Sequence, residues 1–287
     1  MLRLSVFLVT IMLSSIASTQ GYGASKADYA RVPVLFVHGH GLGPGTWKEL
    51  IAYLVNSGYP REYLYAIEIV PDKMANVPAA TKVIAPAVTR LLANARRGAN
   101  KADYKGEPPM RVDIVSHSMG AVSSRWYAVK LHPERVRTWI GLAGANHGTN
   151  ALCNHTDDGA RDLCPAFAHS ATRNPVQVTL NGTRAAPIDE TPYGLGVDDK
   201  QVRRIPPAAD RNIVYFTIRI EPDRWIKPER SALLDGAGGV SVDIPAGLPV
   251  RETRAGNFLM QGKLKHDPFP RYRDVHVLVA ALLAARD

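Results

Sequence analysis

The stretch from residue 112 to 120, Val-Asp-Ile-Val-Ser-His-Ser-Met-Gly, constrains this chain more than any other. An apolar run ends abruptly in the Ser-His-Ser-Met-Gly turn, and a helical pattern begins at Met119. A strand, a sharp turn and a helix in this order are typical of a nucleophile elbow. The elbow needs small residues two positions before and after the nucleophile, because its helix packs tightly on its strand. Ser116, where the commonest version has Gly, and Gly120 meet that need, so we predict Ser118 as a nucleophile.

The rest of the chain alternates between strand and helix patterns. Apolar or alternating runs predict strands at 31–37, 63–70, 111–115, 136–142, 212–220 and 257–260, with a short hairpin inside 236–250. Helices are predicted at 46–55, 78–99 with a break at Pro86, 119–131 and 271–286. This order predicts an α/β fold, with helices on both faces of a mostly parallel central sheet. Catalytic groups should then gather at the carboxyl ends of the strands.

Length and composition limit the class of protein and the number of domains. The chain has 287 residues, of which 46% are hydrophobic and 21% charged, as in a globular protein. We expect a single domain over 25–287, with a polar, proline-rich insertion at about 150–207 that lies over the site. The net charge is +9, but the basic residues are scattered and form no stripe interleaved with aromatics. Nucleic acid is therefore not an expected partner.

The N-terminus is typical of an export signal. Arg3 precedes an apolar run at 4–13, and small residues follow at 14–18. We predict a signal peptide over 1–19, cleaved between about 17 and 24, and a secreted or periplasmic product. The apolar run is shorter than a comfortable membrane span of about 20 residues, so no stable membrane insertion is expected. An uncleaved anchor is the competing interpretation.

Two cysteines, Cys153 and Cys164, stand in one loop-like stretch. In an exported protein an even pair across a short loop predicts a disulfide. A metal site is the rival interpretation, because His155, Asp157 and Asp158 lie between the cysteines. The spacing matches no zinc pattern, so we expect no metal.

A serine nucleophile needs a histidine to take its proton and a carboxylate to orient that histidine. In a chain with this elbow they follow in the order serine, acid, histidine. Asp223 comes just after the strand predicted at 212–220, with Glu221 as a close competitor. His266 stands in the loop before the terminal helix and is the predicted base. His147 ends a strand and could line the site, whereas positions inside a helix or at its end favour structural roles for His276 and His132.

The oxyanion formed on a substrate also needs fixed donors. One is predicted to be the backbone N–H of Met119, which follows the nucleophile at a helix start. The second is predicted to come from the Gly-rich loop at 38–45, through the N–H of His40. A plain strand–helix turn or a phosphate loop is the alternative for that loop. His117 adjoins Ser118, but adjacent side chains at such a turn are expected to diverge.

Taken together, these motifs resemble the α/β-hydrolase superfamily. More narrowly, the chain resembles the secreted class 2 bacterial lipases and esterases and the related polyhydroxybutyrate depolymerases. The resemblance rests on Pro-Val-Leu-Phe-Val-His-Gly at 33–39, Thr-Trp at 46–47, Gly-Tyr at 58–59, the elbow, and Gly-Ala-Asn-His-Gly-Thr at 144–149. It implies the α/β-hydrolase fold, an acyl-enzyme mechanism without a cofactor, and a triad of Ser118, Asp223 and His266.

The leading functional hypothesis is therefore a secreted carboxylic-ester hydrolase of the lipase and esterase type. Its partner would be an ester substrate, either a lipid or a polyester, and extracellular polyester depolymerase is the alternative. Trp47, Phe167, Tyr193 and Trp225 could line an apolar cleft, although aromatic residues serve equally in a core. A catalytically silent binding protein and an acyltransferase are further alternatives, and the oligomeric state is left open.

Overall fold

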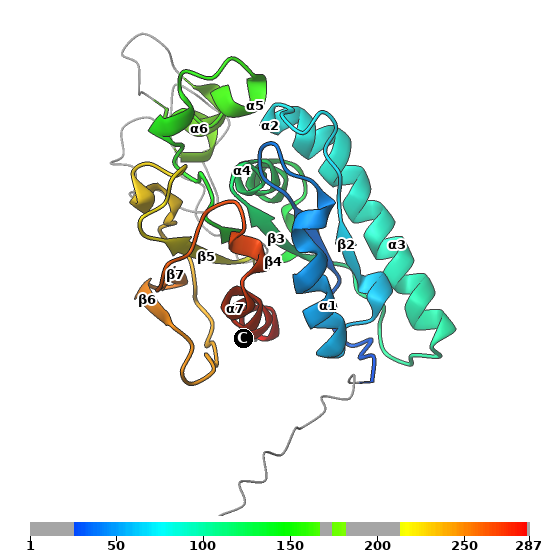
Figure 1. Ribbon diagram of the computed structural model, residues 1–287. Coiled ribbons are helices and arrows are strands. Elements are labelled where there is room, and N and C mark those ends of the chain that lie inside the picture. Colours follow the sequence, from blue (N-terminus) through cyan, green and yellow to red (C-terminus); the bar gives the residue numbers. More distant parts are fainter. Residues whose placement is uncertain (1–25, 167–173, 182–212, 286–287) are drawn as a thin grey trace, which may run out of the picture.

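A computed structural model describes residues 26–166, 174–181 and 213–285. Within these residues seven strands form one sheet in the order β2-β1-β3-β4-β5-β7-β6 (Figure 1). The strands are β1 Val34–Val37, β2 Leu64–Ala66, β3 Val112–His117, β4 Val136–Leu142, β5 Val214–Ile220, β6 Val250–Arg254 and β7 Asn257–Met260. All neighbouring pairs are parallel except β6 and β7. The sheet is that of the α/β-hydrolase fold, as expected.

The hairpin lies later in the chain than the sequence pattern predicts, and β2 is shorter than the strand predicted at 63–70. The hairpin was expected inside 236–250, but β6 and β7 form it with a turn at Gly256. Gly256 has φ +69°, a conformation that suits glycine, and its N–H donates to the Glu252 carboxylate at 2.7 Å. The glycines before residue 250 lie in irregular loop instead.

Helices cover both faces of the sheet, and the strand side chains alternate between them. α1 (Lys48–Asn56) and α7 (Arg273–Ala284) share an apolar core with Val34 and Phe36 of β1. The opposite core contains Leu35 and Val37 together with residues of α3 (Ala85–Lys101) and α4 (Met119–Trp126). Figure 1 shows the two helix layers on either side of the strands. Burial on both sides explains why the parallel strands are almost wholly apolar.

The predicted helix at 78–99 forms in pieces. It begins as the short α2 (Asn76–Pro78), passes through a π-helical turn at Ala79–Ile84, and continues as α3. Pro86, which has no N–H to donate, is the second residue of α3, and α3 directly follows this π-helical turn. The break expected at Pro86 is thus confirmed as a change of helix type. The helix that follows the elbow likewise ends in a π-helical turn, at Tyr127–Leu131.

Above the elbow, short elements pack on the start of α4. They are a 3-10 turn at Asn150–Leu152, α5 (Asp158–Arg161) and α6 (Pro175–Asn181). Leu152, Leu163 and Leu180 form a third apolar cluster with Met119. In Figure 1 α5 lies beside α2 at this end of the molecule, and the Gly159 N–H donates to the Lys73 carbonyl at 3.1 Å. The described part of the predicted insertion therefore lies next to Met119, the residue after the predicted nucleophile.

Some sequence expectations fall outside the described residues. The predicted signal peptide at 1–19, and the stretches 167–173 and 182–212 within the predicted insertion, are among them. None of the helices that the structure describes has both the length and the apolar character needed to cross a membrane.

Candidate active site

Ser118 stands at the sharp turn between β3 and α4. Its backbone has φ 53° and ψ −121°, outside the regions that L-residues favour. Its N–H donates to the Leu142 carbonyl at 3.0 Å, and its carbonyl accepts the Ala121 N–H at 3.1 Å. The side chain is 7% exposed. Hydrogen bonds on either side therefore hold the strained residue so that it faces the cavity described below.

Close packing behind this turn explains why the residues two positions before and two positions after Ser118 are small. A Cβ at Gly120 would lie 2.4 Å from the His38 carbonyl oxygen and 2.6 Å from that of Val37. Those atoms are backbone and cannot move aside. Ser116 is fully buried, and its hydroxyl donates to the Ile140 carbonyl at 3.2 Å. Position 120 therefore has no room for a side chain. The Ser116 hydroxyl has its hydrogen-bond partner within the sheet.

The predicted acid and base contact each other. The Nδ1–H of His266 donates to Oδ2 of Asp223 at 2.9 Å, and the two side chains are only 3% and 2% exposed. The other carboxylate oxygen, Oδ1, accepts the N–H groups of Trp225 at 2.8 Å and Ile226 at 3.0 Å. Asp223 is therefore held by its own turn, and its remaining oxygen is aimed at the histidine. Because Nδ1 carries the proton, Nε2 of His266 has a free lone pair.

Glu221, the competing acid, is engaged elsewhere. Its carboxylate pairs with Arg219, and its side chain is 48% exposed. The carboxylate in contact with His266 is thus that of Asp223.

Ser118 and His266 line one cavity of about 230 Å³. His40, from the Gly-rich loop after β1, lines it too, so the structure brings together three of the predicted site residues. Asp223 is joined to it through His266. Met119, the fifth predicted residue, begins α4, and first-turn N–H groups have no partner within their helix. The remaining lining residues are Gly41, Leu42, His117, Leu152, His155, Trp225 and Asp267. The cavity thus brings together a serine and a histidine that is oriented by a carboxylate.

His38 has a role that sequence reasoning missed. It is fully buried, its Nδ1–H donates to the Gly39 carbonyl at 2.9 Å, and its Nε2 accepts the Ile69 N–H at 3.0 Å. Burial lowers the pKa of His38, which fits the neutral tautomer that these partners require. Because a trans peptide places C=O and N–H on opposite sides, holding the Gly39 carbonyl also fixes the direction of the His40 N–H.

His117 does not diverge from the site as expected. Its ring lies 4.8 Å from that of His266, centroid to centroid, and it lines the same cavity as Ser118. Burial, and then the nearby His266, hold the pKa of His117 well below its usual value. The expectation failed because His117, the last residue of β3, lies against the oxyanion loop at Gly39, which has no side chain and so leaves room for the imidazole. A Cβ at Gly39 would meet Ser118 Cβ at 2.9 Å and His117 Nδ1 at 3.2 Å.

The other candidate residues lie away from this cavity. His147 donates through Nδ1 to the Ser231 carbonyl at 2.8 Å, and His276 contacts the Pro270 carbonyl at 3.0 Å. His132 pairs with Glu134 at the surface. Among the aromatic candidates, Trp225 lines the cavity, whereas Trp47 is buried against Phe36 in the core. Phe167 and Tyr193 lie outside the described residues.

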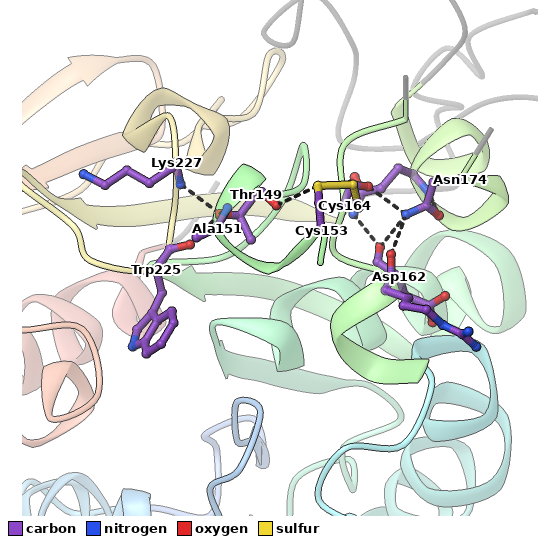
Figure 2. Close-up of a disulfide and its surroundings, with 10 residues drawn as sticks. Thr149, Ala151, Cys153, Asp162, Cys164, Asn174, Trp225 and Lys227 are labelled. Atoms are coloured by element: carbon purple, nitrogen blue, oxygen red, sulfur yellow. Dashed lines mark hydrogen bonds between the residues drawn. A yellow bond between two sulfur atoms is a disulfide. The ribbon is translucent and has the colours of Figure 1, made fainter. Parts of the chain in front are cut away.

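The predicted disulfide is present between Cys153 and Cys164 (Figure 2). The rival interpretation was a metal site in the same loop. Within the part of the chain that the structure describes, no three His, Cys, Asp or Glu side chains are grouped so as to hold a metal ion.

The buried neutral histidines predict a loss of stability in acid. Burial lowers the pKa of His147 to about 3, far below the unfolded value of about 6.5. Between these values the unfolded chain binds the extra proton, so the stability present above pH 6.5 is lost as the pH falls. The free energy of unfolding should drop by up to about 1.4 kcal/mol per pH unit from this residue alone. Urea unfolding at pH 8, 6 and 5 measures the slope. His147→Gln should make the slope shallower by about one proton, and an unchanged slope would contradict the assignment.

Comparisons with known proteins add to this geometry. Residues 31–170 match the model of the family "Lipase (class 2)". Lipase B of Aspergillus fumigatus aligns in structure with a TM-score of 0.52 at 18% identity, over 92% of this chain and 54% of that one. The propeptide form of Bacillus licheniformis lipase BlEst2 gives a TM-score of 0.51 at 16% identity, over 92% and 53%. The chain thus spans about half the length of these two proteins, and the likeness shows a common fold.

Proposed function

We propose that this chain, which shares the fold of the lipases described above and matches the class 2 lipase model over residues 31–170, hydrolyses carboxylic esters through a Ser118–His266–Asp223 triad. One observation carries the proposal. The buried His266–Asp223 pair, joined at 2.9 Å, opens onto the same cavity as the strained Ser118. A serine held at the end of a strand beside an oriented imidazole is the arrangement that acyl transfer requires.

In the proposed reaction, Nε2 of His266 takes the proton of the Ser118 hydroxyl, and the oxygen attacks the ester carbonyl carbon. The resulting oxyanion accepts hydrogen bonds from the N–H groups of His40 and Met119. His266 then gives its proton to the departing alcohol, which leaves Ser118 acylated. Water, deprotonated by the same histidine, attacks the acyl carbon. The bond to Ser118 Oγ then breaks, His266 returns its proton to that oxygen, and the acid is released. Asp223 stabilises the imidazolium that forms in each half of the cycle.

We propose in addition that the enzyme is exported. The disulfide supports this proposal, because such bonds persist in oxidising compartments. The predicted signal peptide supports it from the sequence side. Whether the natural ester is a lipid or a polyester is decided by comparing a triacylglycerol emulsion with a polyhydroxyalkanoate film as substrates for the same preparation.

A covalent probe tests the proposal directly. The chain without residues 1–24 is incubated with a p-nitrophenyl ester and, separately, with a fluorophosphonate. We expect turnover of the ester, stoichiometric loss of activity with the phosphonate, and a mass increase on the peptide that contains Ser118. An unlabelled Ser118 in a preparation that still hydrolyses the ester would overturn the mechanism. Labelling without turnover in water, but with transfer to an added alcohol, would indicate an acyltransferase.

A further inference from the structure

The loop closed by the Cys153–Cys164 disulfide is joined to the loop that carries the proposed acid. Cys153 Sγ lies 3.6 Å from the carbonyl oxygen of Thr149 (Figure 2). The Thr149 hydroxyl accepts the Lys227 N–H at 3.0 Å and donates to the Trp225 carbonyl. These two residues lie two and four positions after Asp223 along the chain. One side of the disulfide loop is therefore attached to the acid loop.

On its other side, the disulfide loop reaches the proposed oxyanion loop through Asp157. Nε2–H of His40 donates to Asp157 Oδ1 at 2.9 Å, across 117 residues of sequence. The same oxygen accepts the Ala160 N–H at 2.8 Å and so caps the first turn of α5. The cap fixes the carboxylate, and the carboxylate in turn fixes the imidazole of His40.

Charge and burial make this contact a firm one. The side chains of His40 and Asp157 are 19% and 24% exposed, so water competes only weakly for the bond. Burial raises the pKa of Asp157, but the Ala160 N–H and His40 outweigh it and hold the pKa below its usual value. The carboxylate is therefore ionised at neutral pH, and hydrogen bonds to ionised acceptors are roughly twice as strong as neutral ones.

The oxyanion loop needs such an anchor, because little else packs on its far end. A Cβ at Gly41, Gly43 or Gly45 would meet nothing within 4 Å. His38 orients the Gly39 carbonyl from below, as described above, and beyond it the Gly41 N–H donates to the Asp72 carbonyl over a long 3.4 Å. The shorter contact of this stretch, at 2.9 Å, is the one that the His40 side chain makes with Asp157.

We propose that Asp157 is a positioning residue for catalysis: through His40 it holds the backbone N–H that receives the oxyanion, and the disulfide holds Asp157. This inference rests on the proposed function. It makes ester hydrolysis sensitive to reduction of Cys153–Cys164, although neither cysteine touches the substrate.

The test compares two replacements of the same carboxylate. Asp157→Ser keeps a cap for α5 but is too short to reach His40, whereas Asp157→Asn keeps both the cap and the acceptor. For Asp157→Ser we expect kcat to fall by about 10- to 100-fold with KM changed less than about threefold, since only the transition state needs the donor. Affinity for a boronic acid, which mimics the tetrahedral state, should fall in parallel. Asp157→Asn should retain most of both quantities.

A double-mutant cycle separates positioning from a general disturbance. His40→Ala keeps the backbone N–H but removes the partner of Asp157, so the double variant His40→Ala with Asp157→Ser should be no slower than the slower single variant. Asp158→Asn is the matched control. That carboxylate is 66% exposed, pairs with Arg161 and should leave kcat unchanged. Dithiothreitol should lower kcat of the parent to the value of a Cys153→Ala, Cys164→Ala variant.

Three results would overturn the inference. They are a kcat for Asp157→Ser within twofold of the parent, effects that multiply in the cycle, and an equal loss in Asp158→Asn. An unchanged kcat on reduction would remove the disulfide from the proposal. Ser118→Ala is measured alongside. If that variant stays active, the proposed function itself fails, whereas an inactive Ser118→Ala with a fully active Asp157→Ser rejects only the role of Asp157.

Discussion

Ser118→Ala should lower kcat/KM for a short-chain ester by about 10⁶-fold, because removal of the nucleophile in a serine triad abolishes the covalent route. The loss should appear in kcat, while KM changes little, since the hydroxyl acts on the reacting bond rather than on ground-state binding. The fold should persist. Alanine keeps the Cβ that serine already places at φ 53°, and the backbone hydrogen bonds of the turn are unaffected. Initial rates with a p-nitrophenyl ester and a urea unfolding curve provide the two measurements.

Ser116→Ala is the control for this experiment. Ser116 lies two residues earlier on the same buried strand, and its hydroxyl bonds only the Ile140 carbonyl. Alanine is also small enough for that position, so activity should remain within about threefold of the parent. Equal loss in both variants would point to a damaged elbow rather than to a missing nucleophile.

The strands of this site and the turns that end them could be predicted from the sequence, because each depends on a short run of consecutive residues. The β4 strand forms over the residues expected, and β5 ends just before the predicted acid. The contact of Asp223 with His266 was also expected, although 43 residues separate them. Chain order on a known fold supplied that contact, and periodicity alone could not.

The residues that sequence reasoning missed are those whose partners come from distant segments. The acceptor role of His38 depends on the Ile69 N–H, which lies 31 residues away. Asp157 was considered only as a metal ligand, because its contact with His40 spans 117 residues and no local pattern encodes it. His117 was misjudged for a related reason. Its direction is set by the space that Gly39 leaves open, and this depends on how the loop after β1 folds over the elbow.

Asp223→Asn should lower kcat by about 10⁴-fold, as replacement of the acid by its amide does in a serine triad. The substitution is nearly isosteric, and Oδ1 of asparagine can still accept the Trp225 and Ile226 N–H groups, so the turn should survive. The amide NH₂ then faces Nδ1 of His266 in place of Oδ2. It can only donate, so the imidazole must place its proton on Nε2. In that tautomer Nε2 has no lone pair with which to take the proton of Ser118.

Glu221→Gln is the control for this prediction, because it removes a carboxylate two residues away that pairs with Arg219 and not with His266. Its kcat should stay within about twofold of the parent, since the amide oxygen of glutamine can still accept a hydrogen bond from Arg219. The tautomer explanation also requires KM and the affinity for a boronic acid to be measured in Asp223→Asn. The loss should be confined to steps that need a basic Nε2, so KM should change little. Equal losses of kcat in Asp223→Asn and Glu221→Gln would mean that the conformation of the acid loop, and not the Asp223 carboxylate, determines the tautomer of His266. The assignment of Asp223 to the triad would then be wrong.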